Sequence, residues 1–246
     1  MDLKLGILII FGLILIIVIL IFVNKIRIRL FFIKLKDGKY SHNYIQFFKD
    51  HNIRSPYDPC LKDDLLLRFL VFVEKNNKSH IFNTKSAIQF GNSVFLTNSN
   101  QIFKTNGKPN CFNTIQINGL DLKVIGYKET IFENNIKALY YCANDIYIMG
   151  EYIFSDVSRT NSDNLIGLLS KKYKIESKID TETFYIEDEN KTQIYFENNG
   201  FEISLKYIYK KNAENFKLIE NELNYFLFNK GENFKNDYQK QLFDKL

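Results

Sequence analysis

The strongest constraint on this chain is an uninterrupted apolar run near its N-terminus. From Leu5 to Val23, nineteen residues carry no charge and no side-chain amide, and all but two glycines are Leu, Ile, Val or Phe. As a helix this run is roughly 28 Å long, which matches a bilayer hydrocarbon core of about 30 Å. A cleaved secretory signal is the alternative, but it has a shorter apolar core and a small-residue cleavage site. The run therefore predicts a transmembrane helix over 5–23.

Basic residues gather on one side of this run. Only Lys4 precedes it, beside Asp2, whereas the segment 24–36 that follows has five cations and no acidic residue: Lys25, Arg27, Arg29, Lys34 and Lys36. Because basic flanks stay on the cytoplasmic side, we expect a single-pass membrane protein with its N-terminus outside and its C-terminal domain in the cytoplasm. The segment 24–36 either lies at the lipid boundary, with its cations near phosphates, or forms a solvated stalk that packs on the domain.

The rest of the chain is electrically balanced, with 27 basic and 27 acidic residues after residue 36. Affinity for nucleic acid depends on a net or clustered excess of Lys and Arg, so we expect no nucleic-acid partner. The three cysteines, Cys60, Cys111 and Cys142, form no C-x-x-C pair and leave an odd number. Reduced thiols are the simplest interpretation of this count.

Helix and strand signals follow one another in a regular order after residue 96. Capped helices are predicted from Thr97 and from Thr160, and each is followed by three strand-like runs. These runs are residues 121–127, 136–143, 146–154, 183–186, 192–197 and 201–209. Asn-rich words recur at offsets of 63 and 64 residues, which indicates a tandem αβββ repeat, although such words also recur by chance in an Asn-rich chain.

The predicted fold class is α+β. One N-terminal transmembrane helix is followed by a soluble domain of antiparallel sheet with packed helices, with the tandem αβββ repeat as one option. A helix after Ser41, a helix from Asp58 to about Lys75 and a hairpin at Gly91-Asn92 form the lead-in to the first repeat unit. The predicted parts are 1–4 (tail), 5–23 (transmembrane helix), 24–36 (basic juxtamembrane segment), 37–96 (lead-in), 97–154 (first unit), 155–210 (second unit) and 211–246 (C-terminal helices).

The sequence predicts no catalytic, metal-binding or cofactor-binding residue. Glycine-rich phosphate loops, a G-x-S-x-G elbow and an H-E-x-x-H helix are all absent. His42 and His51 are nine residues apart, which does not place them on one helix face at ligand distance. Glu151 is the one carboxylate among mostly apolar strand residues. Strand alternation predicts that it faces outward, and a buried acid with a raised pKa is the alternative.

Aromatic side chains are abundant in the predicted strands, and the chain has 15 Tyr and 23 Phe. Exposed aromatics on a sheet face suit protein recognition, because each combines a large apolar area with a polar group. Four tyrosines are candidates for such contacts: Tyr140, Tyr147, Tyr152 and Tyr207. The alternative is that most of these aromatics form ordinary core, in a chain whose Asn, Lys, Ile, Phe and Tyr contents all rise together.

The capped helix, the break at Gly107-Lys108-Pro109 and the aromatic strands that follow are similar to the tandem modules of beta-lactamase-inhibitor-like proteins and of small outer-membrane assembly lipoproteins. The resemblance covers residues 97–209 at most and implies binding of other proteins through the sheet. The chain departs from those families because it has a predicted span and no lipobox cysteine.

We therefore expect a membrane-anchored, non-enzymatic protein-interaction module, such as an inhibitor, an immunity factor or a subunit of an envelope complex. Its expected partners are membrane lipid, through the N-terminal helix, and another protein. The alternative is a membrane-tethered hydrolase or transferase whose dispersed acids and histidines meet only in the fold. A cleft that holds Glu151 with a histidine or a second carboxylate within hydrogen-bond reach would favour the enzyme.

Overall fold

The computed structural model describes residues 24–61, 68–69, 80–117, 119–131, 134–155, 159–179, 182–200, 202–210, 217–222 and 224–225. The chain divides into two compact units, Met1–Pro56 and Tyr57–Leu246. The predicted span, Leu5–Val23, lies outside the described residues. Within the ranges just given, no helix is long and apolar enough to cross a membrane.

In its described residues, the N-terminal unit contains the helices α2 (Lys25–Lys36) and α3 (His42–Asp50). As predicted, Ser41 begins the second helix, because its side chain accepts a hydrogen bond of 3.1 Å from the backbone N–H of Tyr44. α3 is amphipathic and buries four residues, Tyr44, Ile45, Phe47 and Phe48. By contrast, α2 buries none of its residues.

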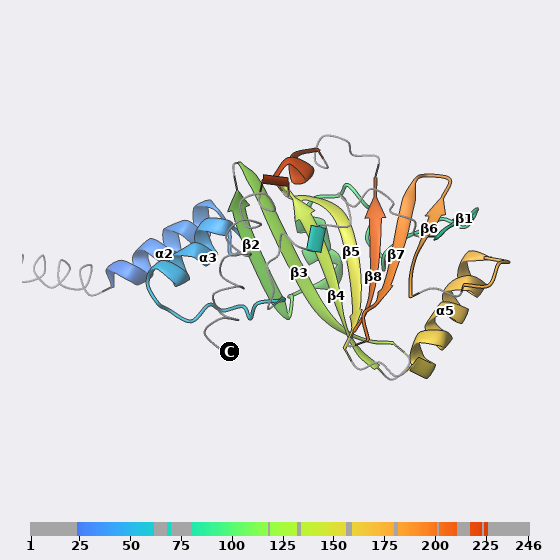
Figure 1. The fold of residues 1–246 in the computed structure, drawn as a ribbon. Helices are drawn as coiled ribbons and strands as arrows, with labels where there is room; N and C mark the ends of the chain where they lie inside the picture. Colours follow the sequence, from blue (N-terminus) through green and yellow to red (C-terminus); the bar gives the residue numbers. More distant parts are fainter. Residues whose placement is uncertain are drawn as a thin grey trace, which may run out of the picture. The chain divides into compact units, whose positions relative to one another are not determined.

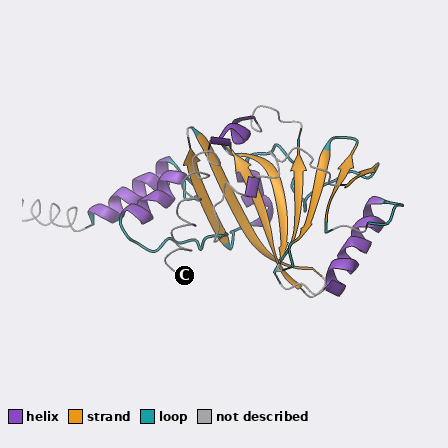
Figure 2. Ribbon diagram, viewed as in Figure 1, coloured by secondary structure: helices purple, strands orange, loops and turns teal. Residues whose placement is uncertain are grey.

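The second unit is built on one eight-stranded sheet (Figures 1 and 2). Its strands are β1 (His80–Thr84), β2 (Cys111–Ile117), β3 (Leu120–Ile131), β4 (Asn134–Ala143), β5 (Ile146–Phe154), β6 (Thr183–Asp188), β7 (Thr192–Asn198) and β8 (Ile203–Tyr209). Their spatial order is β1-β6-β7-β8-β5-β4-β3-β2. The helices α4 (Ser99–Asn106) and α5 (Arg159–Tyr173) accompany the sheet.

The predicted fold class is wrong. The sheet is mixed rather than antiparallel, since β1 runs parallel to β6, and strands dominate over a few helices. No transmembrane helix is found in the described chain. Four strands, β2 to β5, stand between α4 and α5, whereas three follow α5, and all of them join a single sheet. The physical reason is long-range pairing: β1 pairs with a strand about a hundred residues further along the chain, and local patterns carry no information on such a partner.

The predicted lead-in also differs from the structure. Asp58 does not start a helix but forms a parallel bridge with Cys111, and its carbonyl accepts a hydrogen bond of 3.1 Å from the N–H of Phe112. Most of the predicted helix up to Lys75 lies outside the described residues. The predicted hairpin is a tight turn in which Phe90 and Ser93 make a single antiparallel bridge.

Both faces of the sheet are covered. Tyr140 and Tyr141 are consecutive on β4 and therefore point to opposite faces, yet they are only 2% and 0% exposed. Tyr141 belongs to a core cluster with Phe69 and Ile219, whereas Tyr140 packs against Phe90 on the other face, with ring centroids 4.9 Å apart. β5 and β8 are therefore buried almost continuously along their length, as strands covered on both faces usually are.

The turn between β4 and β5 anchors one end of the sheet. Asn144 and Asp145 both have positive φ, 47° and 66°, which is the geometry of a two-residue hairpin turn predicted by this residue pair. The Asp145 carboxylate accepts hydrogen bonds from Lys123 Nζ at 2.8 Å and from Ser99 Oγ at 2.7 Å. Partial burial works to raise the pKa of Asp145, but these bonds hold it below its usual value.

We expect Asp145→Asn to change how stability depends on pH. A carboxyl group with a lowered pKa stabilises the fold above its unfolded pKa, and this contribution is lost as the pH falls through the folded value. The wild type should therefore be more stable than the variant at pH 7, by less than about 1 kcal/mol because the carboxylate is partly solvated. Urea unfolding from pH 7 to pH 3 should show the two stabilities converging below about pH 4, and parallel curves would contradict the assignment.

Candidate functional site

Glu151, the acid that the sequence singles out, lies in the middle of β5 and is 0% exposed. The prediction that it faces outward is wrong. Alternation predicts an exposed side chain only when one face of the sheet is open to water. Here both faces are covered, so every position in the middle of β5 is buried or nearly so.

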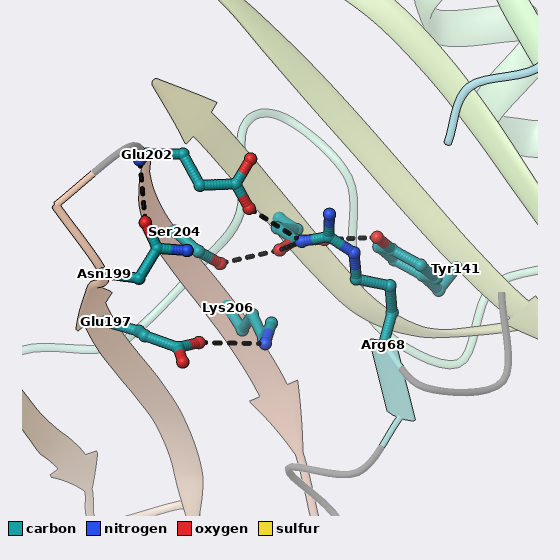
Figure 3. Close-up of polar contacts among 8 residues, drawn as sticks. Arg68, Tyr141, Glu197, Asn199, Glu202, Ser204 and Lys206 are labelled. Carbon is teal, nitrogen blue, oxygen red and sulfur yellow. Dashed lines mark hydrogen bonds and ion pairs between the residues drawn. The ribbon is translucent and has the colours of Figure 1, made fainter. Parts of the chain in front are cut away.

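Three donors from three segments surround the Glu151 carboxylate, and Figure 3 labels them as Tyr141, Ser204 and Arg68. Tyr141 on β4 donates a short hydrogen bond to Oε2, and Ser204 on β8 donates to Oε1 at 2.6 Å. Arg68 Nη1 lies 3.4 Å from the same Oε1 and 3.1 Å from Oε1 of Glu202. Both carboxylate oxygens are thus engaged within the protein.

The electrostatics of this group agree with a fixed ion pair. Burial disfavours the charged guanidinium, but Glu151, Tyr141 and Glu202 together raise the pKa of Arg68 above its ordinary value. Burial and the adjacent carboxylate raise the pKa of Tyr141 well above its usual range, so its hydroxyl keeps its proton and donates. The arrangement surrounds a buried carboxylate with one cation and two hydroxyl donors.

The criterion for an enzyme is met only in part. The second carboxylate, Glu202, reaches Glu151 through Arg68, which bridges the two acids. Beside this group, Lys206 pairs with Glu197 at 3.5 Å and lies 5.4 Å from the ring centroid of Tyr195. In the described part of the chain, Glu151 on β5 and Lys206 on β8 therefore both have charged partners, whereas the buried Oε1 of Gln193 on β7 has no hydrogen-bond partner.

The four predicted contact tyrosines come together on the opposite face, around Phe90. Its ring centroid lies 4.9 Å from Tyr140, 4.4 Å from Tyr152 and 5.3 Å from Tyr207, and Tyr147 lies 5.5 Å from Tyr140. Three of the four are at most 4% exposed, and Tyr152 is half-buried. Buried rings do not touch a partner in this conformation. Their role in an interaction stays a prediction, and it requires the segment around Phe90 to move.

An exposed turn follows Phe90 in the chain, and sequence analysis missed it. We call residues 94–96 the Val94–Leu96 turn. Val94 is 64% exposed and Leu96 is 41% exposed, whereas Phe95 between them stacks on Tyr147 at a centroid distance of 4.9 Å. Leu96 has a φ of 67°, a left-handed conformation that leucine rarely adopts. The sequence predicts a strand here because Ser93-Val94-Phe95 follows the predicted hairpin turn at Gly91-Asn92.

Backbone hydrogen bonds hold this turn against the sheet. The N–H of Leu96 donates to the carbonyl of Tyr147 at 2.9 Å, and the N–H of Tyr147 donates to the carbonyl of Thr97 at 2.9 Å. Thr97 Oγ1 also donates to the carbonyl of Val94 at 2.7 Å. The turn is therefore fixed at both ends, and two aliphatic side chains project from a rigid support.

Two of the three cysteines form a disulfide. Cys60 and Cys111 are linked, with Cα atoms 4.9 Å apart, so the prediction of reduced thiols is wrong for this pair. Gly126 on β3 faces Cys111 across the ladder, and a Cβ there would clash with Cys111 Sγ and approach Cys60 Sγ to 2.9 Å. A glycine at this position leaves the space that the disulfide occupies. Cys142 is free and buried, and burial raises the pKa of its thiol, which makes it a poor nucleophile.

The remaining candidates stay apart from these groups. His51 Nδ1 lies 2.9 Å from the carbonyl of Phe47, and its ring stacks on Phe47, so local structure explains it. Among the described residues, no three His, Cys, Asp or Glu side chains are grouped to hold a metal ion. The five predicted membrane-flank cations all lie on α2: Lys25, Arg27, Arg29, Lys34 and Lys36. The predicted cytoplasmic placement of the C-terminal domain stays a prediction.

The chain was compared with known proteins by sequence and by structure. No family model, no curated protein and no solved structure matches it. The structure alone is therefore the basis for assigning a function.

Proposed function

We propose that this protein is a non-enzymatic interaction module that contacts a protein partner through the Val94–Leu96 turn. The observation that carries the proposal is the left-handed backbone of Leu96, which costs about 1–2 kcal/mol for a residue with a Cβ. Strained residues persist where the surrounding structure enforces them, and they cluster at functional sites. Leucine at this position lowers the stability of the fold, and it leaves an apolar side chain 41% exposed.

The support beneath the turn suits binding. A surface that is already ordered loses little conformational entropy when it meets a partner, so more of the contact energy appears as affinity. Phe95 provides this order, because it stacks on Tyr147 and also on Tyr209, at 5.8 Å between ring centroids. Of the four predicted tyrosines, Tyr147 forms part of the base of the turn, whereas the other three pack around Phe90.

The enzyme alternative has less support. The donors around Glu151 occupy both of its oxygens, and its nearest charged partner is the cation of Arg68. A general acid or base needs a free path to the proton that it transfers. The Glu151 group is better explained as an anchor that joins Arg68 to β4, β5 and β8.

Leu96→Gly is expected to stabilise the protein and to weaken partner binding. Glycine adopts positive φ without strain, so the free energy of unfolding should rise by up to about 1 kcal/mol, with a melting temperature about 2–4 °C higher. The same change removes one of the two exposed aliphatic side chains. Thermal unfolding and quantitative affinity capture of the full-length protein from the cells that produce it measure the two effects.

Leu168→Ala is the matched control, because Leu168 is also an exposed leucine, at 42%, but lies on α5. Wild type and this control should retain a stoichiometric protein partner, whereas Leu96→Gly and Val94→Asp should lose it. Equal capture by all four proteins would refute the proposed contact, as would recovery of the wild type without any partner.

A further inference from the structure

The helix α2 carries an exposed apolar stripe. Its residues Ile28, Phe31, Phe32 and Leu35 follow the i, i+3, i+4, i+7 spacing that places side chains on one helix face. Phe31 is 58% exposed, Phe32 is 64% exposed and Leu35 is 68% exposed. An apolar face of this kind usually packs into a core, yet no residue of α2 is buried.

The opposite side of α2 has a different environment. Leu30 and Ile33 on that side are half-buried. Arg29, next in the chain to Leu30, lies over the ring of Phe47 in α3, 5.9 Å from its centroid. Packing within the N-terminal unit therefore covers Leu30 and Ile33 in part, whereas Ile26 at 45% and the stripe of Phe31, Phe32 and Leu35 are exposed.

Cations border the stripe on both sides. Arg27 and Lys34 are seven residues apart and follow one edge, whereas Lys25, Arg29 and Lys36 follow the other edge at spacings of four and seven. α2 contains no acidic residue. An apolar stripe between two rows of long cationic side chains suits the interface of an anionic bilayer, where acyl chains meet phosphates. There the cations can extend back to the phosphates.

We propose that α2 is a surface-binding helix that lies on an anionic lipid bilayer, with Phe31, Phe32 and Leu35 in the acyl boundary and its cations at lipid phosphates. Anionic lipid is favoured over a neutral surface because each cation near the bilayer adds attraction that depends on the surface charge. The proposal selects the first of the two alternatives that the sequence leaves open for residues 24–36, and it is independent of the Val94–Leu96 turn.

The chain contains no tryptophan, so one introduced residue gives a local signal. The experiment uses the full-length protein with Phe32→Trp, placed in nanodiscs of neutral lipid or of neutral lipid mixed with an anionic lipid, each with brominated acyl chains as quencher. We expect a blue-shifted emission and about twofold stronger quenching in the anionic bilayer, and a return toward the neutral value at 1 M salt, where screening is nearly complete. Leu168→Trp on α5 is the control and should be unquenched in both.

Two further variants in the Phe32→Trp background separate the contribution of the cations from that of the apolar stripe. Arg27→Gln with Lys34→Gln should remove the dependence on anionic lipid, and Leu35→Ser should reduce quenching in both bilayers. Equal quenching in neutral and anionic bilayers would overturn the proposal, because the cations would then contribute nothing. A blue shift without any bilayer would also overturn it, since protein or a second copy would then cover the stripe.

Discussion

Cys60→Ser is expected to lower the free energy of unfolding of the sheet unit by about 4 kcal/mol. The disulfide joins residues 51 positions apart, and closing a loop of this length removes a large part of the entropy of the unfolded chain. The bond also fixes the segment at Asp58 along the edge of β2, which this segment also contacts through a β-bridge and a hydrogen bond from the N–H of Cys60 to Asn113 Oδ1. Urea unfolding under oxidising conditions, compared with the same protein in excess reductant, measures the loss.

Cys111→Ser should give the same loss as Cys60→Ser, and reductant should destabilise the wild type but neither variant. Alkylation of the denatured, unreduced wild type should label one thiol, Cys142. Three labelled thiols would contradict the pairing. Disulfides persist in oxidising compartments and are reduced in the cytosol. One labelled thiol in protein alkylated directly on lysis would therefore argue against the cytoplasmic placement that the basic flank predicts.

Arg68→Met is expected to cost about 3 kcal/mol or more of unfolding free energy. The variant leaves the Glu151 carboxylate fully buried without its cation, and an uncompensated buried charge is among the most destabilising changes a protein can undergo. Glu202 loses its partner as well, but it is partly exposed and water can solvate it. Chemical denaturation at pH 7 measures the change.

A double-mutant cycle separates this effect from lost packing. Arg68→Met should cost much less in the Glu151→Gln background, because glutamine is neutral: its carbonyl oxygen still accepts from Ser204, and its amide N–H can donate to the Tyr141 hydroxyl oxygen. Lys206→Met is the matched control: its carboxylate partner is 37% exposed, so its loss should be about 1 kcal/mol or less. Equal costs for the Arg68 and Lys206 variants would show that the Glu151 group is not a buried ion pair.

The local elements of the fold could be predicted from the sequence. The pattern around Asn144-Asp145 predicts β4, β5 and the turn between them, because alternation and positive-φ residues act over a few positions. The architecture could not be predicted. The sequence of β1 does not mark it as a strand, and it becomes one by pairing in parallel with β6. The segment at Asp58, predicted as the start of a helix, is extended and forms a bridge with Cys111.

The candidate site is harder to predict from the sequence than the strands are. The sequence shows Glu151 as the one carboxylate among mostly apolar strand residues, but its burial depends on what covers the second face of the sheet. The Cys60–Cys111 pairing depends on the same long-range geometry, and Gly126 reveals it only once the β2–β3 register is known. The left-handed backbone of Leu96 has no sequence signal, since leucine is not a residue that turns of this kind favour.

The most direct test of the proposed function is a site-specific crosslink at the Val94–Leu96 turn. A photoreactive amino acid is placed at position 94 of the full-length protein in the cells that produce it, and at position 168 as the control. The account predicts one discrete protein adduct from position 94, its loss when Leu96→Gly is added, and no matching adduct from position 168. The absence of an adduct from position 94, or the same adduct from both positions, would contradict it.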